Sequence, residues 1–452
     1  MAVTGSQWRR VREAPAGDRL LAWAVLTLMA VSLFTAMNAV KLGLAGLPFR
    51  TFTVPLGVAL VLLVRPGLIV DAATELKRPL LLVLLFLLLG LGVSFVARNP
   101  PAAVFQLVIE AHVQAALTLI LVGVAWRLTS PRLIMLIFLG SFTLSALTSI
   151  FQFLGLDFAW GMRAFIGRLS NDPPITQSFY LDRWRALGLA FNPVILGTQA
   201  CVAFAGFFAY RLWVTEGAIL RRIDTQLMLM LAFCALVAIT AGNRSPLLGF
   251  ALFFLIYSAI AAPRVFAVAL PLMLLAGTMA AGILAYLEDA GLRVADTNDS
   301  SAEGRPTLFR YGWQLFLDRP LGYGVVASSM NYAAGYSDLV RYMENPLVIR
   351  HYTLHNYFLL MLTQYGIGFV LLALLAIPRE RRTWWGLLAF VPYIAHIAFH
   401  NAGPFLGDFL IWYVLPLFYP ALRRFGTAPA PARDGGAGRK SWRRSDRQPR
   451  AA

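Results

Sequence analysis

Long apolar stretches follow one another along most of the chain, and the segments between them hold most of the polar residues. Each stretch is near the ~20 residues that a helix needs to cross ~30 Å of hydrocarbon. The first is too long for the apolar core of a signal peptide and lacks a small-residue cleavage site, so we interpret it as a membrane anchor. The pattern predicts twelve spans, the second of them short, at roughly 20–40, 49–64, 78–97, 102–126, 133–156, 187–212, 225–242, 246–262, 265–287, 354–377, 384–400 and 404–422.

Composition supports the same class of protein. Of the 452 residues, 59% are hydrophobic and only 13% are charged, whereas a soluble domain carries about a quarter charged residues. Backbone groups in lipid must be satisfied within the segment, and the strand-length alternation of a β-barrel is absent, so we predict an all-α polytopic membrane protein. Cys201 and Cys234 both fall within predicted spans, where we expect buried thiols rather than a disulfide.

The net charge of +17 would suit nucleic-acid binding, but the distribution of the charge argues against that function. If the amino terminus is cytoplasmic, most Lys and Arg residues fall on the cytoplasmic side and the short outer loops hold one or two each, as the positive-inside rule requires. We therefore expect a cytoplasmic segment 1–19, a transmembrane domain 20–422 and a cytoplasmic tail 423–452. The basic tail, Arg433 to Arg450, is interpreted as a disordered, lipid-facing anchor or, alternatively, as a specific partner site.

Two outer loops, about 157–186 and 288–353, are longer than any predicted cytoplasmic connection between spans. Long ordered loops in compact proteins usually carry function, so we expect the working surface on the periplasmic side. The second loop should contain a helix that starts with Pro306 as its first residue and ends at the segment DRPLGYG, Asp318 to Gly324. Its apolar face would comprise Leu308, Trp313, Leu315 and Phe316.

Cationic and polar residues gather at the outer ends of the predicted spans. Arg244 lies in a tight outer turn, against the positive-inside trend, and is either a functional residue or a snorkelling headgroup anchor. Arg305 would lie at the amino terminus of the loop helix, where free N–H groups favour an anion, or simply on the loop surface. The others on this side are Arg183, Arg185, Arg350, His351, His355, Asn356, His396, His400 and Asn401.

Arginines beside lipid suit a phosphate group, because guanidinium forks bind phosphate oxygens bidentately. A lipid-linked pyrophosphate is the natural ligand, and it is also a good leaving group. Displacing it requires that the developing negative charge be stabilised and that the attacking hydroxyl lose its proton. We therefore interpret the arginines as the diphosphate site and His355 as the general base.

Two pairs of histidines, His351 with His355 and His396 with His400, have the i, i+4 spacing of a helix face, which raises the question of zinc. A metalloprotease helix would carry Glu after the first His, but Tyr352 stands there. We favour no metal and no cofactor. Glu110 and His112 lie inside the fourth span, where hydrogen-bonded packing is favoured over a proton relay.

Four segments resemble, in this order, the pattern of the O-antigen ligase and polymerase family: RWRALGLAFNP, AGNRSPLLG, GRPTLFRYGWQLFLDRPLGYG and LHNYFLLMLTQYGIG. They extend from about residue 183 to 370, and the twelve predicted spans agree with the family's topology. Its members are glycosyltransferases of the bacterial inner membrane that use undecaprenyl-pyrophosphate glycans. The resemblance implies a GT-C-like, metal-independent enzyme whose active site faces the periplasm.

Carried over by motif, the resemblance implies that Arg244 and Arg305 bind the pyrophosphate, that Arg185 assists them and that His355 activates the acceptor hydroxyl. Supporting positions would be Arg183, Arg350, His351, Asn356 and His400. The chain departs from the pattern twice: Asn243 stands where the family usually has Ser, and the histidine motif ends in Phe369 rather than in a small residue.

The acceptor is not given by these motifs. A ligase passes the glycan to lipid A–core, a polymerase passes it to a second lipid-linked repeat, and related members transfer it to proteins. The single large loop near the histidine motif favours the ligase. A transporter of lipid-linked sugars would instead require charges through the bilayer centre and inverted repeats, and a non-catalytic scaffold of polysaccharide export is a third alternative.

Overall fold

Helices make up most of the chain that the structure, a computed structural model, describes: residues 16–38, 43–44, 47–48, 50–169, 185–279, 282, 286, 300–377, 380 and 384–427. The first half contains α2 (Ala16–Met37), α3 (Arg50–Val64), α4 (Pro66–Glu75), α5 (Lys77–Val96), α6 (Pro101–Val108), the π-helix η1 (Ile109–Val113), α7 (Gln114–Leu128), α8 (Pro131–Phe153), α9 (Asp157–Leu169) and α10 (Pro193–Val214). Strands β1 (Gly43–Leu44) and β2 (Leu47–Pro48) form one short antiparallel pair.

The second half begins with η3 (Ala218–Leu220), α11 (Thr225–Thr240), α12 (Arg244–Ala261), α13 (Pro263–Thr278), α15 (Ser300–Asp318), η5 (Ser329–Tyr336) and α16 (Val348–His351). It ends with α17 (Tyr357–Tyr365), α18 (Ile367–Ala376), α19 (Trp384–Ala389), α20 (Val391–Ile397), α21 (Leu410–Val414), η7 (Leu415–Leu417) and α22 (Phe418–Thr427). The predicted all-α membrane class is confirmed.

Among the described residues, six helices are long and apolar enough to cross a membrane. They begin at Gly17, Lys77, Pro101, Pro131, Pro193 and Arg244. Helix α3, which coincides with the second predicted span, meets α4 beyond that span at a bend of 118°. Helices α17 and α18, which make up the tenth predicted span, meet at a bend of 119°. If each bent pair counts as one span, the number rises to eight. The remaining predicted spans coincide with shorter helices, so the full count of twelve stays a prediction.

Helix starts follow from the local sequence. Proline occupies the first position of α4, α6, α8, α10 and α13, where its missing N–H has no partner to lose. Ser130, Asn192, Asp224 and Asn356 each accept a hydrogen bond from the backbone N–H three residues later. Such caps satisfy one of the free donors at a helix amino terminus.

The predicted tenth span, 354–377, is broken at Gly366. This residue has φ +61°, and a Cβ added there would lie 2.3 Å from the carbonyl oxygen of Pro320, so only glycine fits. Three backbone hydrogen bonds join the break to the outer loop: Ile367 donates to Pro320, Tyr323 to Thr363, and Gly324 to Gln364. The loop therefore satisfies backbone groups that the bend removes from the helix.

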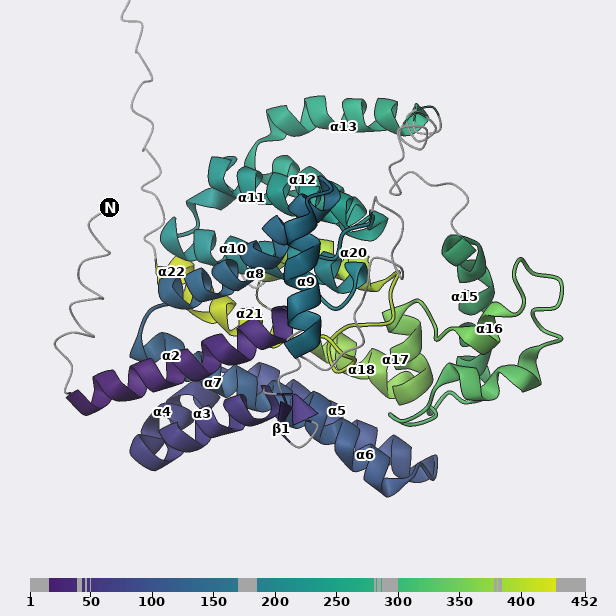
Figure 1. Cartoon of the computed structure of the whole chain (residues 1–452), viewed down its shortest axis with the longest axis horizontal. Helices are drawn as coiled ribbons and strands as arrows, with labels where there is room; N and C mark the ends of the chain where they lie inside the picture. The colour runs from purple at the N-terminus through teal and green to yellow at the C-terminus, as the bar shows by residue number, and fades with distance from the viewer. Residues whose placement is uncertain are drawn as a thin grey trace, which may run out of the picture.

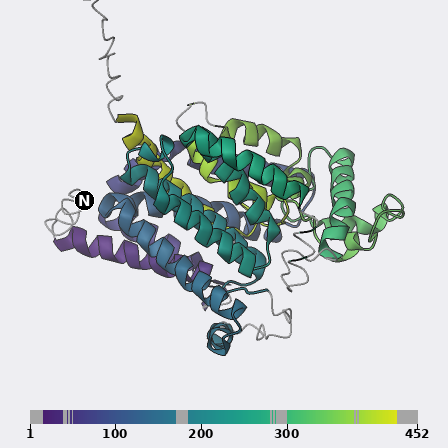
Figure 2. The same cartoon turned by 90° about the horizontal axis from the view of Figure 1, so that it is seen from above.

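Helix α10 is central, and 78% of its apolar stretch is buried inside the protein. Helices α8, α11, α12 and α20 surround it (Figures 1 and 2). Cys201 and Cys234 are both buried free thiols, as predicted. Helices α15 and α16 lie together at one side of this bundle (Figure 1).

The loop helix differs from the prediction at its start. Helix α15 begins at Ser300, so Pro306 lies inside it and Arg305 in its second turn, and the expected position of Arg305 at a free helix terminus is wrong. The predicted end near Asp318 is correct. Leu308 and Leu315 are buried as expected, but Trp313 is exposed, and Tyr311 takes its place on the buried face.

Candidate functional site

Three helices meet at the amino-terminal end of α10 and carry a buried chain of polar side chains. Gly197 of α10 permits the contact, because a Cβ there would lie 2.7 Å from the Asn243 amide nitrogen and 3.2 Å from the His396 ring. Asn243 precedes α12 and donates to the carbonyl of Pro193, at 2.6 Å. The turn that contains Arg244 is thereby fixed against the start of α10.

Ser245 links two histidines of α20 and of the segment that follows it. Its Oγ lies 2.9 Å from Nδ1 of His396 and 3.1 Å from Nε2 of His400. On its other side, His396 contacts the Thr198 hydroxyl at 3.0 Å and the Val194 carbonyl at 3.3 Å. The predicted i, i+4 pairing of His396 and His400 is real, since their rings lie 4.4 Å apart, but the shared partner is a serine.

Arg185 opens a segment that is held in place by α8 and α11. Ala186 donates to the Thr240 carbonyl at 2.8 Å. Gln152 of α8 accepts from the backbone N–H groups of Leu187 and Gly188 and donates to the Gly188 carbonyl. These bonds fix the backbone beside Arg185, whose side chain is half-buried.

Arg305 reaches the same region from α15. The carbon atom at the centre of its guanidinium lies 5.8 Å from the centre of the Phe399 ring, next to His400 in the chain. Helix α15 is itself anchored on the neighbouring loop, because the Thr307 hydroxyl donates to the Glu344 carbonyl at 2.5 Å.

The environment of His400 shows which groups are close together. His400 lies between α20 and α21, outside the candidate spans. Burial lowers its pKa well below the usual value, and electrostatic interaction with His396, Arg305, His355 and Arg185 lowers it further. Arg185, Arg305 and His355, which come from three distant parts of the sequence, are thus close enough to act on one imidazole.

His355 is half-buried in the short loop before α17. Its Nδ1 lies 2.8 Å from the Thr353 carbonyl oxygen, which can only accept, so Nδ1 carries the proton and Nε2 carries the lone pair. Asn401, beside His400, donates to the Thr353 hydroxyl at 2.7 Å. This bond connects the loops that carry His355 and His400.

Other predicted site residues have different surroundings. Arg244 is exposed at the first position of α12. Arg350 is exposed and donates to the Ser337 hydroxyl at 2.9 Å. His351 is exposed at the end of α16, so the expectation that His351 and His355 share one helix face is wrong. Asn356 caps α17.

Arg183 and the basic tail from Arg433 to Arg450 lie outside the described residues. Within the described ranges, no group of three or more His, Cys, Asp or Glu side chains could hold a metal ion.

Glu110 and His112 belong to the π-helix η1. Glu110 accepts from Gln106 at 3.1 Å, and His112 lies 3.1 Å from the Tyr365 hydroxyl and stacks on Phe405. These contacts are those of hydrogen-bonded packing.

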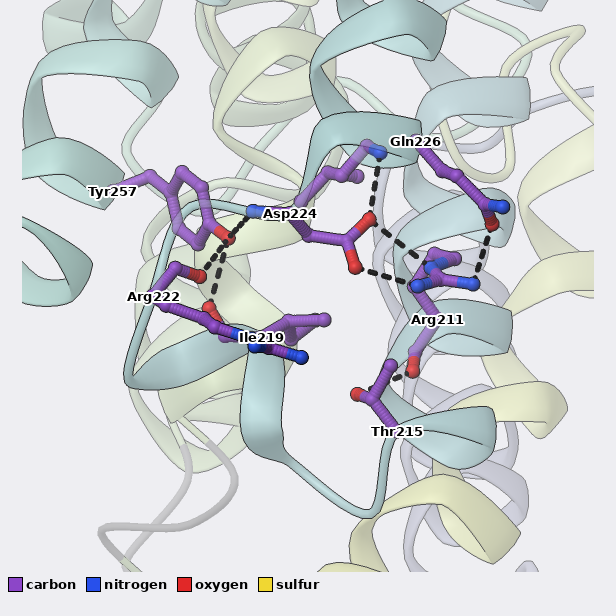
Figure 3. A network of polar contacts seen from close by, with 8 residues as sticks. Arg211, Thr215, Ile219, Arg222, Asp224, Gln226 and Tyr257 are labelled. Carbon is purple, nitrogen blue, oxygen red and sulfur yellow. Dashed lines mark hydrogen bonds and ion pairs between the residues drawn. The ribbon is translucent and has the colours of Figure 1, made fainter.

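A second polar cluster lies at the opposite end of α10 (Figure 3). Arg211 donates to both carboxylate oxygens of Asp224, at 3.1 and 2.5 Å. Asp224 also caps α11, and the Tyr257 hydroxyl joins the same turn by donating to the Ile219 carbonyl at 2.8 Å. These contacts join α10, the η3 turn, the start of α11 and α12 to one another.

The sequence did not indicate that Thr198 belongs to the polar cluster or that Ser245 bridges His396 and His400. Ser245 follows Arg244 in the turn motif AGNRSPLLG, and that position was its only signal. Thr198 stands within an apolar run and gave none.

Residues 229–376 of the chain match the family model described as O-Antigen ligase. The matched segment includes Arg244, Arg305 and His355 and ends before His396. No curated protein matches the chain. The resemblance drawn from the sequence is thereby confirmed over residues 229–376, in a chain whose apolar helices are those of a multi-pass membrane protein.

Proposed function

We propose that the protein moves a glycan from undecaprenyl pyrophosphate to an acceptor hydroxyl at the periplasmic face of the bacterial inner membrane. The family match supports a glycosyltransferase of the ligase and polymerase type. The observation that carries the proposal is that Arg305 lies over Phe399, beside His400, and that Asn401 bonds Thr353 in the loop of His355. Arg185, Arg305 and His355 also interact electrostatically with His400. Positive charge and a general base are the two requirements for displacing a diphosphate.

The reaction follows from these side chains. The acceptor hydroxyl attacks the anomeric carbon of the donor, the bond from that carbon to the pyrophosphate oxygen breaks, and the electron pair leaves with the diphosphate. Nε2 of His355 takes the hydroxyl proton, because Nδ1 is already committed to the Thr353 carbonyl. Arg305, Arg185 and Arg244 stabilise the charge that develops on the leaving group.

We further propose that the acceptor is lipid A–core, which makes the protein a ligase. The polymerase alternative uses the same chemistry with a second lipid-linked repeat as acceptor. Both reactions use the protein's own residues and require no cofactor in this scheme.

The test is incubation of purified protein in detergent with an undecaprenyl-pyrophosphate glycan and either acceptor. A glycolipid product supports the ligase, and a lengthened lipid-linked glycan supports the polymerase. Transport is impossible in detergent, so either product also excludes the transporter as the sole function. Absence of both products with folded wild-type protein would reject the proposal.

The base is tested with His355→Ala. Transfer should fall at least about 100-fold, the usual contribution of a positioned general base. Binding of inorganic pyrophosphate by the same variant should persist, because the arginines remain. Wild-type transfer by His355→Ala would remove His355 from the mechanism.

A further inference from the structure

Helix α9 directly follows a membrane span. Helix α8, with 23 residues, is long enough to cross the membrane and ends at Phe153, and α9 begins at Asp157. The three residues between them reach at most ~10 Å, and Gly155, with φ +75°, turns the chain there. Helix α9 consequently runs across the direction of α8 (Figures 1 and 2). It therefore lies at the end of a span, where hydrocarbon gives way to headgroups.

The inward face of α9 packs on the segment that precedes α10. Ile166 of α9 and Leu189 of that segment belong to one buried apolar cluster. The side-chain nitrogen of Gln152 donates to the Ala159 carbonyl of α9 at 3.3 Å and to the Gly188 carbonyl of the segment at 3.1 Å. A single side chain at the end of α8 thus holds α9 and the segment in a fixed position relative to one another.

The outward face of α9 is apolar and exposed. Phe158 and Phe165 are 57% and 55% exposed, and Gly161 between them is exposed as well. Residues at i, i+3 and i+7 share one face of a helix, so the two rings lie on one stripe. Arg168 continues this stripe at the end of the helix. Helix α9 thus has a side that is buried against the protein and an aromatic side that is not.

The exposed stripe of α9 continues the lipid-facing side of α8. Leu144 and Leu147 of α8, and Leu154 just after it, are exposed on one side. Apolar side chains that a membrane span leaves exposed face the hydrocarbon. The Phe151 ring lies on the same side of α8, and its centre is 5.4 Å from the centre of the Phe158 ring. The lipid contact of α8 therefore extends without interruption onto α9.

We propose that α9 is an interfacial helix whose Phe158 and Phe165 side chains insert into the leaflet on the Arg185 side of the membrane. Such helices lie in the plane of the bilayer, with the apolar face ~5–10 Å into the boundary between headgroups and acyl chains. The exposed Arg168 then reaches the lipid phosphates with its long side chain. The neighbouring segment, held by Gln152, brings Arg185 to the same depth.

Helix α9 in this position deepens the proposed function, on which the inference rests for the class of ligand. A diphosphate that is attached to a lipid lies at the depth of the headgroups, whereas the diphosphate of a water-soluble sugar nucleotide does not. Because α9 holds Arg185 at that depth, it favours the lipid-linked donor. Helix α9 thus acts on the donor by setting a position and not by contact.

The stripe is tested with spin labels on the full-length protein in nanodiscs of phosphatidylethanolamine and phosphatidylglycerol. The chain has two cysteines, Cys201 and Cys234, and both are buried, so a label attaches to the thiol that Phe158→Cys or Phe165→Cys introduces. Electron paramagnetic resonance measures collisions of each label with oxygen, which concentrates in lipid, and with a nickel chelate, which stays in water. We expect several-fold more collisions with oxygen than with nickel at both positions.

Two further variants calibrate these labels. Leu147→Cys is the lipid-facing control on α8, and Arg310→Cys, exposed on α15, is the control in water. A result like that of the water control at both positions of the stripe would overturn the proposal. Spin–spin broadening at the stripe would place a second copy of the chain there, and protection from both reagents would place another protein there. Either of these outcomes also overturns the proposal.

The depth of the segment is tested with a label introduced by Phe191→Cys, an exposed position near Arg185. Its ratio of oxygen to nickel collisions is measured with and without the double substitution Phe158→Ser and Phe165→Ser. We expect the double substitution to lower the ratio several-fold, because polar side chains no longer hold α9 in the leaflet. The matched control, Phe158→Leu with Phe165→Leu, keeps the stripe apolar and should leave the ratio unchanged. An equal ratio with and without the serines would show that α9 does not set the depth.

Glycan transfer in the same nanodiscs distinguishes this inference from the proposed function. We expect the double serine variant to transfer several-fold more slowly and to bind inorganic pyrophosphate in detergent as the wild type does, because no bilayer sets a depth there. Transfer at the wild-type rate in nanodiscs would overturn the selection of the donor by depth. Absence of transfer by the wild type would reject the proposed function, and the spin-label results would still decide where α9 lies.

Discussion

The two ends of α10 hold two polar clusters of different composition. At the carboxyl-terminal end, Arg211 is paired with the Asp224 carboxylate, and the side chains of this pair are 14% and 13% exposed. At the amino-terminal end, Arg185 and Arg305 are grouped with imidazoles. In the first arrangement the two opposite charges neutralise each other, and the ion pair stabilises a turn. The second brings positive charge to one place, which is what an anionic substrate requires.

Replacing the functional arginine should have the largest effect. We expect Arg305→Lys to lower glycan transfer by about 100- to 1,000-fold, because an ammonium group cannot reproduce the guanidinium fork beside a developing negative charge. The matched control is Arg310→Lys, an exposed arginine of the same helix, which should transfer at the wild-type rate. Equal rates for the two variants would remove Arg305 from the site.

Removing the structural carboxylate should have a smaller effect, and on a different quantity. Asp224→Ala leaves Arg211 without its carboxylate and α11 without its cap, and we expect a loss of about 2–4 kcal/mol in the free energy of unfolding. Asp224→Asn retains the cap and should lose less. Denaturant unfolding in detergent measures both. Folded Asp224→Ala should still transfer glycan, and loss of transfer without loss of stability would break the distinction between the two clusters.

Asn356 tests the boundary between the two kinds of role, because it lies beside His355 but caps α17. Asn356→Ala should cost about 1 kcal/mol of stability, and Asn356→Ser, which retains the capping oxygen, should cost almost nothing. Transfer by Asn356→Ser should remain near wild type. A large drop in transfer for that stable variant would show that the amide contacts substrate.

The smallest expected effect is a dependence of stability on pH. The folded state holds the pKa of His400 below its ordinary value of about 6.5, so the unfolded state binds the proton more readily. His400 therefore favours folding above about pH 6.5, and this contribution is lost as the pH falls toward the lowered pKa. The melting temperature in detergent should decrease between about pH 7 and pH 5, and less so in His400→Asn. An identical pH dependence in the wild type and in His400→Asn would contradict the lowered pKa of His400 in the folded state.

Much of the candidate site could be predicted because Arg and His residues are rare in apolar sequence. Their positions relative to the ends of the predicted spans follow directly from the sequence. Arg185, Arg305, His355 and His400 were all identified in this way, and the first three interact electrostatically with His400. Three-dimensional contacts decided the rest. The start of α15 and the bend at Gly366 depend on packing between the loop and helices distant in sequence. Ser245 could be recognised as a bridge only when α12 and α20 were placed together.

The docking of Pro320–Gly324 on the broken helix α17–α18 limits how the protein can admit its substrates. If the loop separated from the helices, the backbone groups of Thr363, Gln364 and Ile367 at the break would lose their hydrogen-bond partners. Each such group exposed to hydrocarbon costs several kcal/mol. A movement of the loop that keeps these three bonds has to carry the helix break with it. His355, one residue before the cap of α17, would move together with α17 and keep its orientation relative to that helix.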